Sequence, residues 1–340
     1  MEGVPDLLLI GGGFFGYARE IVRALEGRGR CVEWHEDRPA LDPYTKSAIR
    51  LAPWLVASKS DAYFAQIAAG LRGKPIADVL VIKGEALSCE AIKALRREAP
   101  QARFTLYFWD SYLNMPKGSE KKVQHFDHAF TFDPMDADRD PRLRYRPLFF
   151  LPEYANLAAV HEDIDLLFLG TAHTDRYAVL KRLAKSLDSS VRFERVLYVP
   201  SKLLFAARRA FDKDFWGAKR REFVFEPLGK TEIRALLSRT KAVVDIERSV
   251  QTGLTMRSVE MFGAGKKLIT TNRKIVDADL YDPANIAVID RSHPRISMDF
   301  LRRPYAPPKQ QLLYRYSLEG WLDEVVSSTG GSVRRINGSG

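Results

Sequence analysis

The chain has 340 residues, enough for two domains of roughly 150 residues each. Hydrophobic residues make up 46% and charged residues 28%, as in globular proteins, and no run approaches the roughly 18 apolar residues that a membrane-spanning helix needs. The net charge of +10 is uneven, because residues 1–150 hold 22 Lys and Arg against 20 Asp and Glu, whereas residues 151–340 hold 31 against 23. A basic half can attract nucleic acid, an anionic membrane or a phosphorylated small molecule.

The first apolar run leads into a glycine-rich turn and an expected helix. Gly11, Gly13 and Gly16 have the spacing G-x-G-x-x-G, and Glu36 and Asp37 follow about twenty positions later. This pattern is typical of a dinucleotide site, where glycines let a pyrophosphate approach the backbone and a carboxylate binds the ribose. An NAD- or FAD-dependent oxidoreductase is therefore one hypothesis.

Strand-like and helix-like segments alternate through the first half, which is the pattern of βαβ units and parallel sheets. The expected strands are residues 6–11, 31–36, 78–84, 103–110 and 128–133, with a helix within 85–100.

The alternation restarts after a proline-bounded connection near residue 150. The expected strands are 165–173, 191–199, 241–247, 267–272 and 286–290, with helices within 175–187, 230–240 and 255–265. We predict two tandem Rossmann-like, doubly wound α/β domains facing a cleft. The predicted boundaries are 1–155 and 156–310, then a helical stretch 311–328 that could pack back on the N-terminal domain, and a flexible tail 329–340.

Two carboxylates follow apolar strands of the first half, where the carboxyl ends of parallel strands place ligand-binding loops. Asp110 and Glu85 are therefore candidates for a general base, although each could instead satisfy backbone donors at a helix N-terminus. The His-Phe-Asp-His run at 125–128 lacks further ligands at a known spacing, so we predict no metal site.

Residues 243–272 hold the most informative motif. A buried strand ends near Asp245, and the helix that follows the loop carries Arg257 and Glu260 on one face. The N-terminus of such a helix can bind a diphosphate, Arg257 can add a charged fork, and Glu260 can accept a hydrogen bond from a ribose. Alternatively, Arg257 and Glu260 form an ordinary intrahelical ion pair and the glycines only end the helix.

The run R-S-V-E-M-F-G-A-G-K-K-L-I-T-T-N, residues 257–272, resembles the C-terminal domain of GT-B glycosyltransferases, especially bacterial capsule and lipopolysaccharide sugar transferases. The resemblance implies a metal-independent glycosyltransferase that needs no cofactor. Its co-substrate would be a nucleotide-diphosphate sugar and its acceptor a glycan or lipid-linked molecule in surface polysaccharide biosynthesis. Retaining members often carry a second glutamate eight positions earlier, but this chain has Thr252 there, so a retaining mechanism is not carried over.

The resemblance also implies where the two substrates would bind. By it, the helix and its preceding loop hold the donor, Glu260 meets the ribose, and the turn at 168–176 faces the cleft. The expected donor-binding residues are Gly170, Thr171, Arg176, Thr252, Gly253, Leu254, Arg257, Glu260 and Lys266. His173 is a third catalytic candidate, and a plain capped helix is the alternative for that turn.

The first glycine turn lies where this architecture binds the acceptor. Its aromatic residues suit stacking on a sugar or packing under the turn better than binding a pyrophosphate. The expected acceptor-binding residues are Gly12, Gly13, Phe14, Phe15 and Tyr17.

Residues 201–223 interleave aromatic and basic side chains. Such a segment can lie on an anionic membrane, stack nucleic-acid bases, or form a core-packed helix with a solvated basic face. No nucleic-acid module is recognisable, so we expect no nucleic-acid partner and favour peripheral membrane contact.

The N-terminus has no signal-peptide pattern, and Cys31 and Cys89 read as free core thiols. Both features predict a cytoplasmic protein, which could work at the inner face of the cytoplasmic membrane.

Overall fold

The computed structural model describes residues 3–13, 16–42, 45, 48–49, 52–247 and 253–326. The chain divides into two compact units, Met1–Pro147 with Leu318–Gly340, and Leu148–Ser317. The chain thus enters the second unit earlier than the expected boundary at 155–156. The stretch expected as one helix at 311–328 forms two, of which only the second belongs to the first unit. The tail 329–340 lies outside the described residues.

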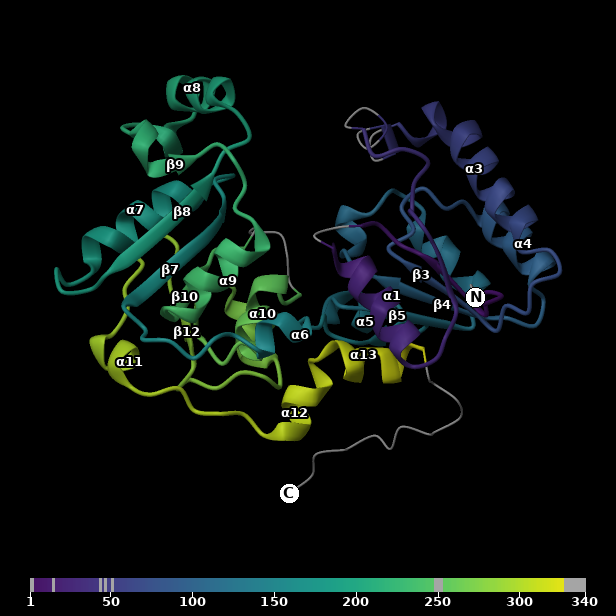
Figure 1. Cartoon of the computed structure of the whole chain (residues 1–340). Helices are drawn as coiled ribbons and strands as arrows, with labels where there is room; N and C mark the ends of the chain where they lie inside the picture. Colours follow the sequence, from purple (N-terminus) through teal and green to yellow (C-terminus); the bar gives the residue numbers. More distant parts are fainter. Residues whose placement is uncertain are drawn as a thin grey trace. The chain divides into compact units, whose positions relative to one another are not determined.

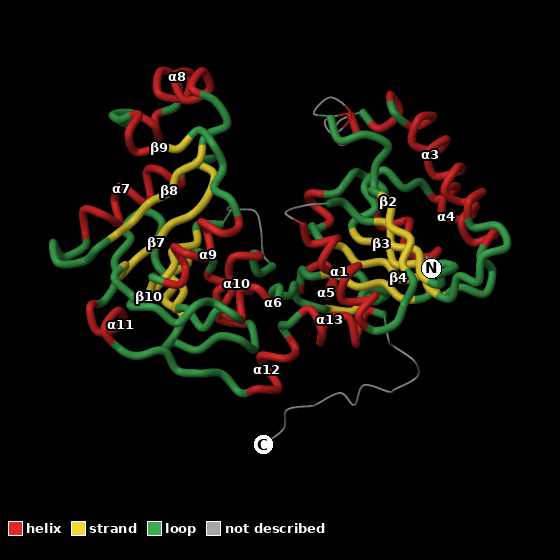
Figure 2. The backbone as a smooth tube through the Cα atoms, viewed as in Figure 1, coloured by secondary structure: helices red, strands yellow, loops and turns green. Residues whose placement is uncertain are grey.

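The first unit is built on a six-stranded parallel sheet in the order β2-β1-β3-β4-β5-β6. Figures 1 and 2 show its helices and strands. They are β1 (Leu7–Ile10), α1 (Tyr17–Gly27), β2 (Val32–His35), α3 (Ala57–Gly70), β3 (Asp78–Ile82), α4 (Cys89–Glu98), β4 (Arg103–Phe108), β5 (His128–Thr131), α5 (Pro134–Arg139), β6 (Arg144–Tyr145) and α13 (Leu318–Val325).

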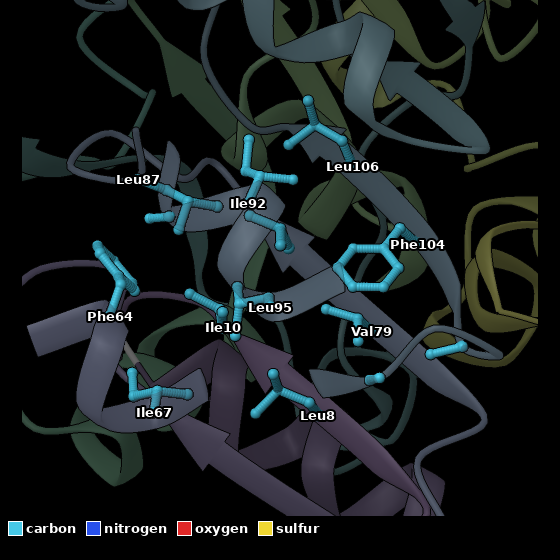
Figure 3. Close-up of a cluster of buried hydrophobic side chains, with 14 of the residues drawn as sticks. Leu8, Ile10, Phe64, Ile67, Val79, Leu87, Ile92, Leu95, Phe104 and Leu106 are labelled. Carbon is cyan, nitrogen blue, oxygen red and sulfur yellow. The ribbon is translucent and has the colours of Figure 1, made fainter. Parts of the chain in front are cut away.

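The central strands β1 and β3 are apolar and buried at nearly every position, as expected where helices cover both faces of a parallel sheet, whereas the outer strands β2 and β6 carry polar side chains. Figure 3 shows one face, where Leu8 and Ile10 of β1 meet Phe64 of α3 and Ile92 and Leu95 of α4. Since successive side chains of a strand point to opposite faces, the alternate residues of β1 and β4 face the other layer. That layer holds α1 and the C-terminal helix α13.

Helix α13 docks on the first unit through one buried aromatic residue and several ion pairs at its rim. The Trp321 ring is fully buried and meets Tyr107 of β4 edge-on at 4.9 Å between centroids. Arg28 pairs with Glu319 and Asp323, and Arg146 pairs with Glu324 at 2.7 Å.

The second unit is also built on a six-stranded parallel sheet, in the order β12-β11-β10-β7-β8-β9. Counted from β7, this is the 3-2-1-4-5-6 order of dinucleotide-binding domains. Its elements are α6 (Pro152–Ala155), β7 (Ile164–Thr171), α7 (Arg176–Ser186), β8 (Phe193–Tyr198), α8 (Lys202–Phe211), β9 (Phe223–Val224), α9 (Lys230–Ser238), β10 (Thr240–Asp245), α10 (Met256–Gly263), β11 (Lys267–Thr270), β12 (Ile286–Val288), α11 (Met298–Arg302) and α12 (Gln310–Arg315). The predicted α/β class with two parallel sheets is confirmed.

The two ends of the second unit lie side by side against α10. Phe150 forms a parallel bridge with Ser317, and its N–H donates to the Tyr316 carbonyl at 2.8 Å. The Phe150 ring packs so tightly on Gly263 that a Cβ on this glycine would lie 2.2 Å from the ring. Gly263 is therefore needed for close packing, whereas Gly265, at φ 62°, supplies the left-handed residue after the helix.

Replacing Gly263 by Ala should destabilise the second unit by about 1–3 kcal/mol, because Phe150 is buried and must shift. Urea unfolding measures the loss. The double variant with Phe150→Leu should recover part of it, and additive effects of the two substitutions would contradict direct contact.

Replacing Trp321 by Ala should cost about 3–5 kcal/mol of unfolding free energy, because it empties the centre of the α13 interface. Glu319→Ala on the same helix is the matched control and should cost under about 1 kcal/mol, because that side chain is half exposed. Equal losses in a urea titration would show that α13 is not held by its aromatic residue.

Candidate functional site

In each unit, the loops that follow the strands gather at the carboxyl edge of the sheet. Strand order reverses beside β1 in the first unit and beside β7 in the second. Ligands of open α/β sheets bind at such switch points. Both edges carry buried charged side chains, and each is considered by itself.

A lysine lies between two carboxylates at the edge of the first unit. The Lys83 amine is 2.6 Å from the Asp110 carboxylate and 3.3 Å from that of Glu85. Lys83 directly follows β3 and has a left-handed backbone conformation, with φ 69°, which residues other than glycine rarely adopt. A strained, buried lysine that holds two carboxylates is typical of functional sites.

The two carboxylates differ in exposure. The Glu85 side chain is fully buried, whereas that of Asp110 is 32% exposed. Asp110 can therefore meet a substrate hydroxyl, whereas Glu85 lies behind Lys83. The structure brings both candidate bases together but leaves only Asp110 open to solvent.

The buried charges continue toward β2. Arg38 lies 3.4 Å from Glu85 and donates from Nε to the Asp37 carboxylate at 3.0 Å. Burial raises the pKa of Asp37, while the Arg38 charge opposes that shift. Asp37 is thus part of an internal chain of alternating charges rather than a ligand for a ribose.

The glycine turn after β1 is occupied by the chain's own carboxylate. The Gly13 N–H donates to both Glu36 oxygens, at 3.2 and 3.1 Å, and a Cβ on Gly13 would lie 2.9 Å from one of them. An anion already sits where a pyrophosphate would bind, and Asp37 is ion-paired inside the protein. The oxidoreductase hypothesis is not supported.

The expected acceptor residues only partly gather at this edge. Gly13 is exposed and Gly12 is buried. Tyr17 is the first residue of α1, and its buried ring meets the Trp109 ring edge-on, at 5.6 Å between the ring centroids. The Tyr17 ring therefore packs beneath the glycine turn and contacts Trp109, the residue before Asp110. Phe14 and Phe15 lie outside the described residues.

In the second unit, Arg176 ties the two strands at the switch point together. Its guanidinium donates to the Ile246 carbonyl after β10 at 2.7 Å and to the Thr171 carbonyl at the end of β7 at 3.2 Å. Gly170 leaves room for it, since a Cβ there would lie 3.3 Å from the guanidinium. Arg176 thus holds the turn in place, and Gly170 and Thr171 lie at the predicted edge.

His173 follows in the same turn, half buried, with Nδ1 3.3 Å from the Thr174 hydroxyl. It lies at the carboxyl edge of the second unit, whereas Asp110 lies on the first.

A second arginine, Arg291, joins three loops of the same edge. It contacts Asp175 at 3.1 Å, Glu247 at 2.9 Å and the Thr271 hydroxyl at 3.4 Å. Glu247 is nearly buried, so its charge needs this partner. Arg176 and Arg291 thus connect described residues that follow β7, β10 and β11 at the switch point.

The N-terminus of α10 lies at this edge, and Thr255 is its N-cap residue. The Thr255 hydroxyl accepts from the Ser258 N–H at 3.0 Å and donates to Asp245 at the end of β10. Gly253 and Leu254, both buried, lead into this cap, and Asn272 reaches the Gly253 carbonyl at 3.4 Å. Thr252 lies outside the described residues.

Arg257 and Glu260 do form the intrahelical pair, at 3.1 Å. The Glu260 carboxylate is nearly buried and also accepts from the Tyr154 hydroxyl of α6. Burial and the neighbouring Glu260 charge raise the pKa of Tyr154. Glu260 is thus an oriented, nearly buried acceptor in the middle of α10, the helix that begins at the carboxyl edge of its sheet.

Lys266 is the expected donor residue that the structure separates from the others. It precedes β11, at the amino edge of the sheet, where its amine pairs with Glu162 and donates to the Ser238 carbonyl at 3.3 Å. Lys266 lies between the end of α10 and the start of β11. A strand of a parallel sheet begins at the amino edge, so Lys266 lies at the edge opposite to the loops that follow the strands.

Sequence reasoning missed Lys83, Arg38, Arg291 and Tyr154. Lys83 had a usable signal, because it directly follows the buried strand β3 and lies two residues before Glu85. Arg291 had none, since its partners Asp175 and Glu247 are 116 and 44 residues away.

Three further features bear on the chemistry. No group of three His, Cys, Asp or Glu within the described ranges could hold a metal ion. Among the residues placed by the structure, no helix is long and apolar enough to cross a bilayer. Cys31 and Cys89 are free, but both are half exposed rather than in the core.

Solved structures of known proteins resemble the whole chain. A glycosyltransferase from Rickettsia africae aligns with a TM-score of 0.59 at 11% identity, covering 96% of this chain and all of that one. Anabaena Alr3699/HepE in complex with UDP and glucose aligns at 0.56 and 11%, covering 96% and 100%. The UDP-GlcNAc 2-epimerase of Methanocaldococcus jannaschii aligns at 0.54 and 11%, covering 94% and 98%.

No protein-family model and no curated protein matches the sequence. At 11% identity the structural likeness shows the fold alone. The chain therefore has the fold of GT-B glycosyltransferases, with two Rossmann-like α/β domains, as the resemblance of residues 257–272 predicted.

Proposed function

We propose that the protein transfers a sugar from a nucleotide-diphosphate sugar to a hydroxyl group of a glycan or lipid-linked acceptor in bacterial surface polysaccharide biosynthesis, without a metal ion. The observation that carries the proposal is Glu260, an oriented and nearly buried carboxylate beside Arg257 on α10, in a chain with the GT-B fold. No reducible cofactor enters this reaction.

The donor would bind at the carboxyl edge of the second unit. The positive dipole at the N-terminus of α10 suits a diphosphate, and Arg257 is 22% exposed and can reach an anion. Glu260 would accept hydrogen bonds from the ribose hydroxyls. The complex of HepE with UDP and glucose supports this assignment by likeness of fold.

The acceptor would bind at the carboxyl edge of the first unit, with Asp110 as general base. Asp110 takes the proton of the acceptor hydroxyl while the hydroxyl oxygen forms a bond to the anomeric carbon of the donor sugar. The bond between that carbon and the diphosphate oxygen breaks, and the nucleotide diphosphate leaves with its electrons. Lys83 orients Asp110 through the 2.6 Å ion pair. His173 stays a second candidate, on the donor side.

We also propose that the reaction takes place in the cytoplasm, at the inner face of the cytoplasmic membrane. Two free cysteines suit a reducing compartment.

UDP and its sugar conjugates should raise the melting temperature of the full chain. At 100 times its dissociation constant, a bound ligand adds about 2.7 kcal/mol to the free energy of unfolding. Chelating agents should leave the shift unchanged. Glu260→Gln should weaken UDP binding about tenfold or more, because the ribose loses a charged acceptor.

Lys266→Met is the matched control for the donor site. Lys266 lies at the opposite edge, so this variant should keep the UDP-induced shift even if the unliganded protein melts earlier. If no nucleoside diphosphate or nucleotide sugar in a panel shifts the melting temperature, sugar transfer is the wrong function.

The UDP-sugar that raises the melting temperature most serves as the donor in a rate assay that measures released UDP. Asp110→Asn should lower this rate about 100-fold or more, since the amide cannot take a proton, and should leave the affinity for the donor unchanged. Glu85→Gln should instead lower stability and leave the rate of the folded protein within a few-fold, because Glu85 is buried. A full rate in Asp110→Asn would assign the base elsewhere, with His173→Ala as the next variant.

A further inference from the structure

Helix α8 turns an apolar face toward solvent, and its segment, residues 201–223, is rich in exposed basic side chains. We propose that this face docks the second unit on an anionic lipid bilayer. The α8 face is defined by Leu203, Ala206, Ala207, Ala210 and Phe211. Docking depends on this face alone and therefore goes beyond the proposed sugar transfer.

Two side chains on the inner side hold α8 in place. Phe205 is the buried residue of this ten-residue helix and packs on Phe223 at 4.9 Å between ring centroids. Arg208, three residues later, pairs with Asp212 at 2.8 Å, donates to the Ala172 carbonyl and lies 4.0 Å over the Phe215 ring. Because residues three apart share a helix side, these contacts fix which side faces outward.

The α8 face lies on the other side and is unusually apolar for a solvent-facing surface. Its positions follow the i, i+3, i+4, i+7, i+8 pattern that normally points into a core. Leu203 is 81% exposed and Phe211 90% exposed. Figures 1 and 2 show α8 at the margin of its unit, where its outer side is not covered by another helix or strand of that unit.

Trp216 is a further exposed aromatic residue of the same segment, five residues after the end of α8. It is 65% exposed, and the Lys181 amine of α7 holds its carbonyl at 3.4 Å. Tryptophan and phenylalanine favour the boundary between lipid headgroups and acyl chains. An apolar helix face with an adjacent tryptophan therefore suits the surface of a bilayer.

The charges around this surface select an anionic partner. The exposed cations of the segment are Lys202, Arg209, Lys213, Lys219, Arg220 and Arg221. Of the three acids of residues 201–223, Asp212 pairs with Arg208, Glu222 accepts from Tyr177 and the Lys219 N–H, and Asp214 is partly buried, so the exposed charges of the segment are predominantly basic. Each basic residue near an anionic bilayer adds about 1 kcal/mol of attraction, so the segment favours acidic lipids over neutral ones.

Sedimentation of the full chain with lipid vesicles tests the proposal. Vesicles containing phosphatidylglycerol should bind at least about tenfold more protein at low salt than pure phosphatidylcholine vesicles. The variant Leu203→Ser with Phe211→Ser should lower the partition coefficient more than about tenfold, because two large apolar groups stay in water. Lys219→Glu with Arg221→Glu should lower it roughly fivefold or more per residue.

Matched controls use the same changes outside the α8 face. Leu113→Ser with Val276→Ser alters two other exposed apolar side chains, and Lys59→Glu with Lys274→Glu alters two other exposed lysines. Both controls should bind vesicles like the unaltered protein. Because Leu203 and Phe211 are exposed, their substitution should leave the melting temperature unchanged, so lost binding would report the surface rather than unfolding.

Three results would overturn the proposal. The unaltered protein could show no preference for phosphatidylglycerol, or Leu203→Ser with Phe211→Ser could bind as well as the controls. Alternatively, light scattering could show a dimer that this variant converts to a monomer, which would make the face an interface between two copies. The vesicle assay contains no nucleotide, so its outcome is independent of sugar transfer.

Discussion

Parallel hydrogen bonding between neighbouring strands is the constraint on which this structure depends. Every paired strand in both sheets runs parallel, so each connection must cross the sheet through a helix or long loop. The crossovers bury both faces, which is why the strands in the centre of each sheet are largely apolar. They also collect all the loops that follow strands at one edge, and the polar side chains of each unit gather there.

Such an edge requires buried charges to be compensated, and each unit does this with lysine or arginine side chains. In the first unit Lys83 and Arg38 separate the carboxylates of Asp37, Glu85 and Asp110. In the second unit Arg291 neutralises the nearly buried Glu247. A buried charge without a partner is costly, so these contacts stabilise the positions of the side chains that they join. Side chains held in place in this way can orient a substrate.

The fold and the chemistry are separate conclusions. The same two-domain fold occurs in a glycosyltransferase and in a UDP-GlcNAc 2-epimerase, so the reaction has to be inferred from side chains. Glu260 and Arg257 carry the inference for the donor, and Asp110 carries it for the acceptor. Helix α8 adds a surface outside both proposed substrate sites, and a lipid-linked acceptor would lie in the bilayer that this surface is proposed to bind.

The sequence by itself determined the α/β class, nearly all the long strands and the position of α10, because apolar periodicity and helix caps act between near neighbours. It also placed Asp110, Glu85 and Glu260 at strand ends or on the right helix. Only the tertiary structure decided that Glu85 is buried behind Lys83, that Glu36 occupies the first glycine turn, and that Lys266 lies at the far edge. Those outcomes depend on strand order and on partners far apart in the chain, which local patterns do not encode.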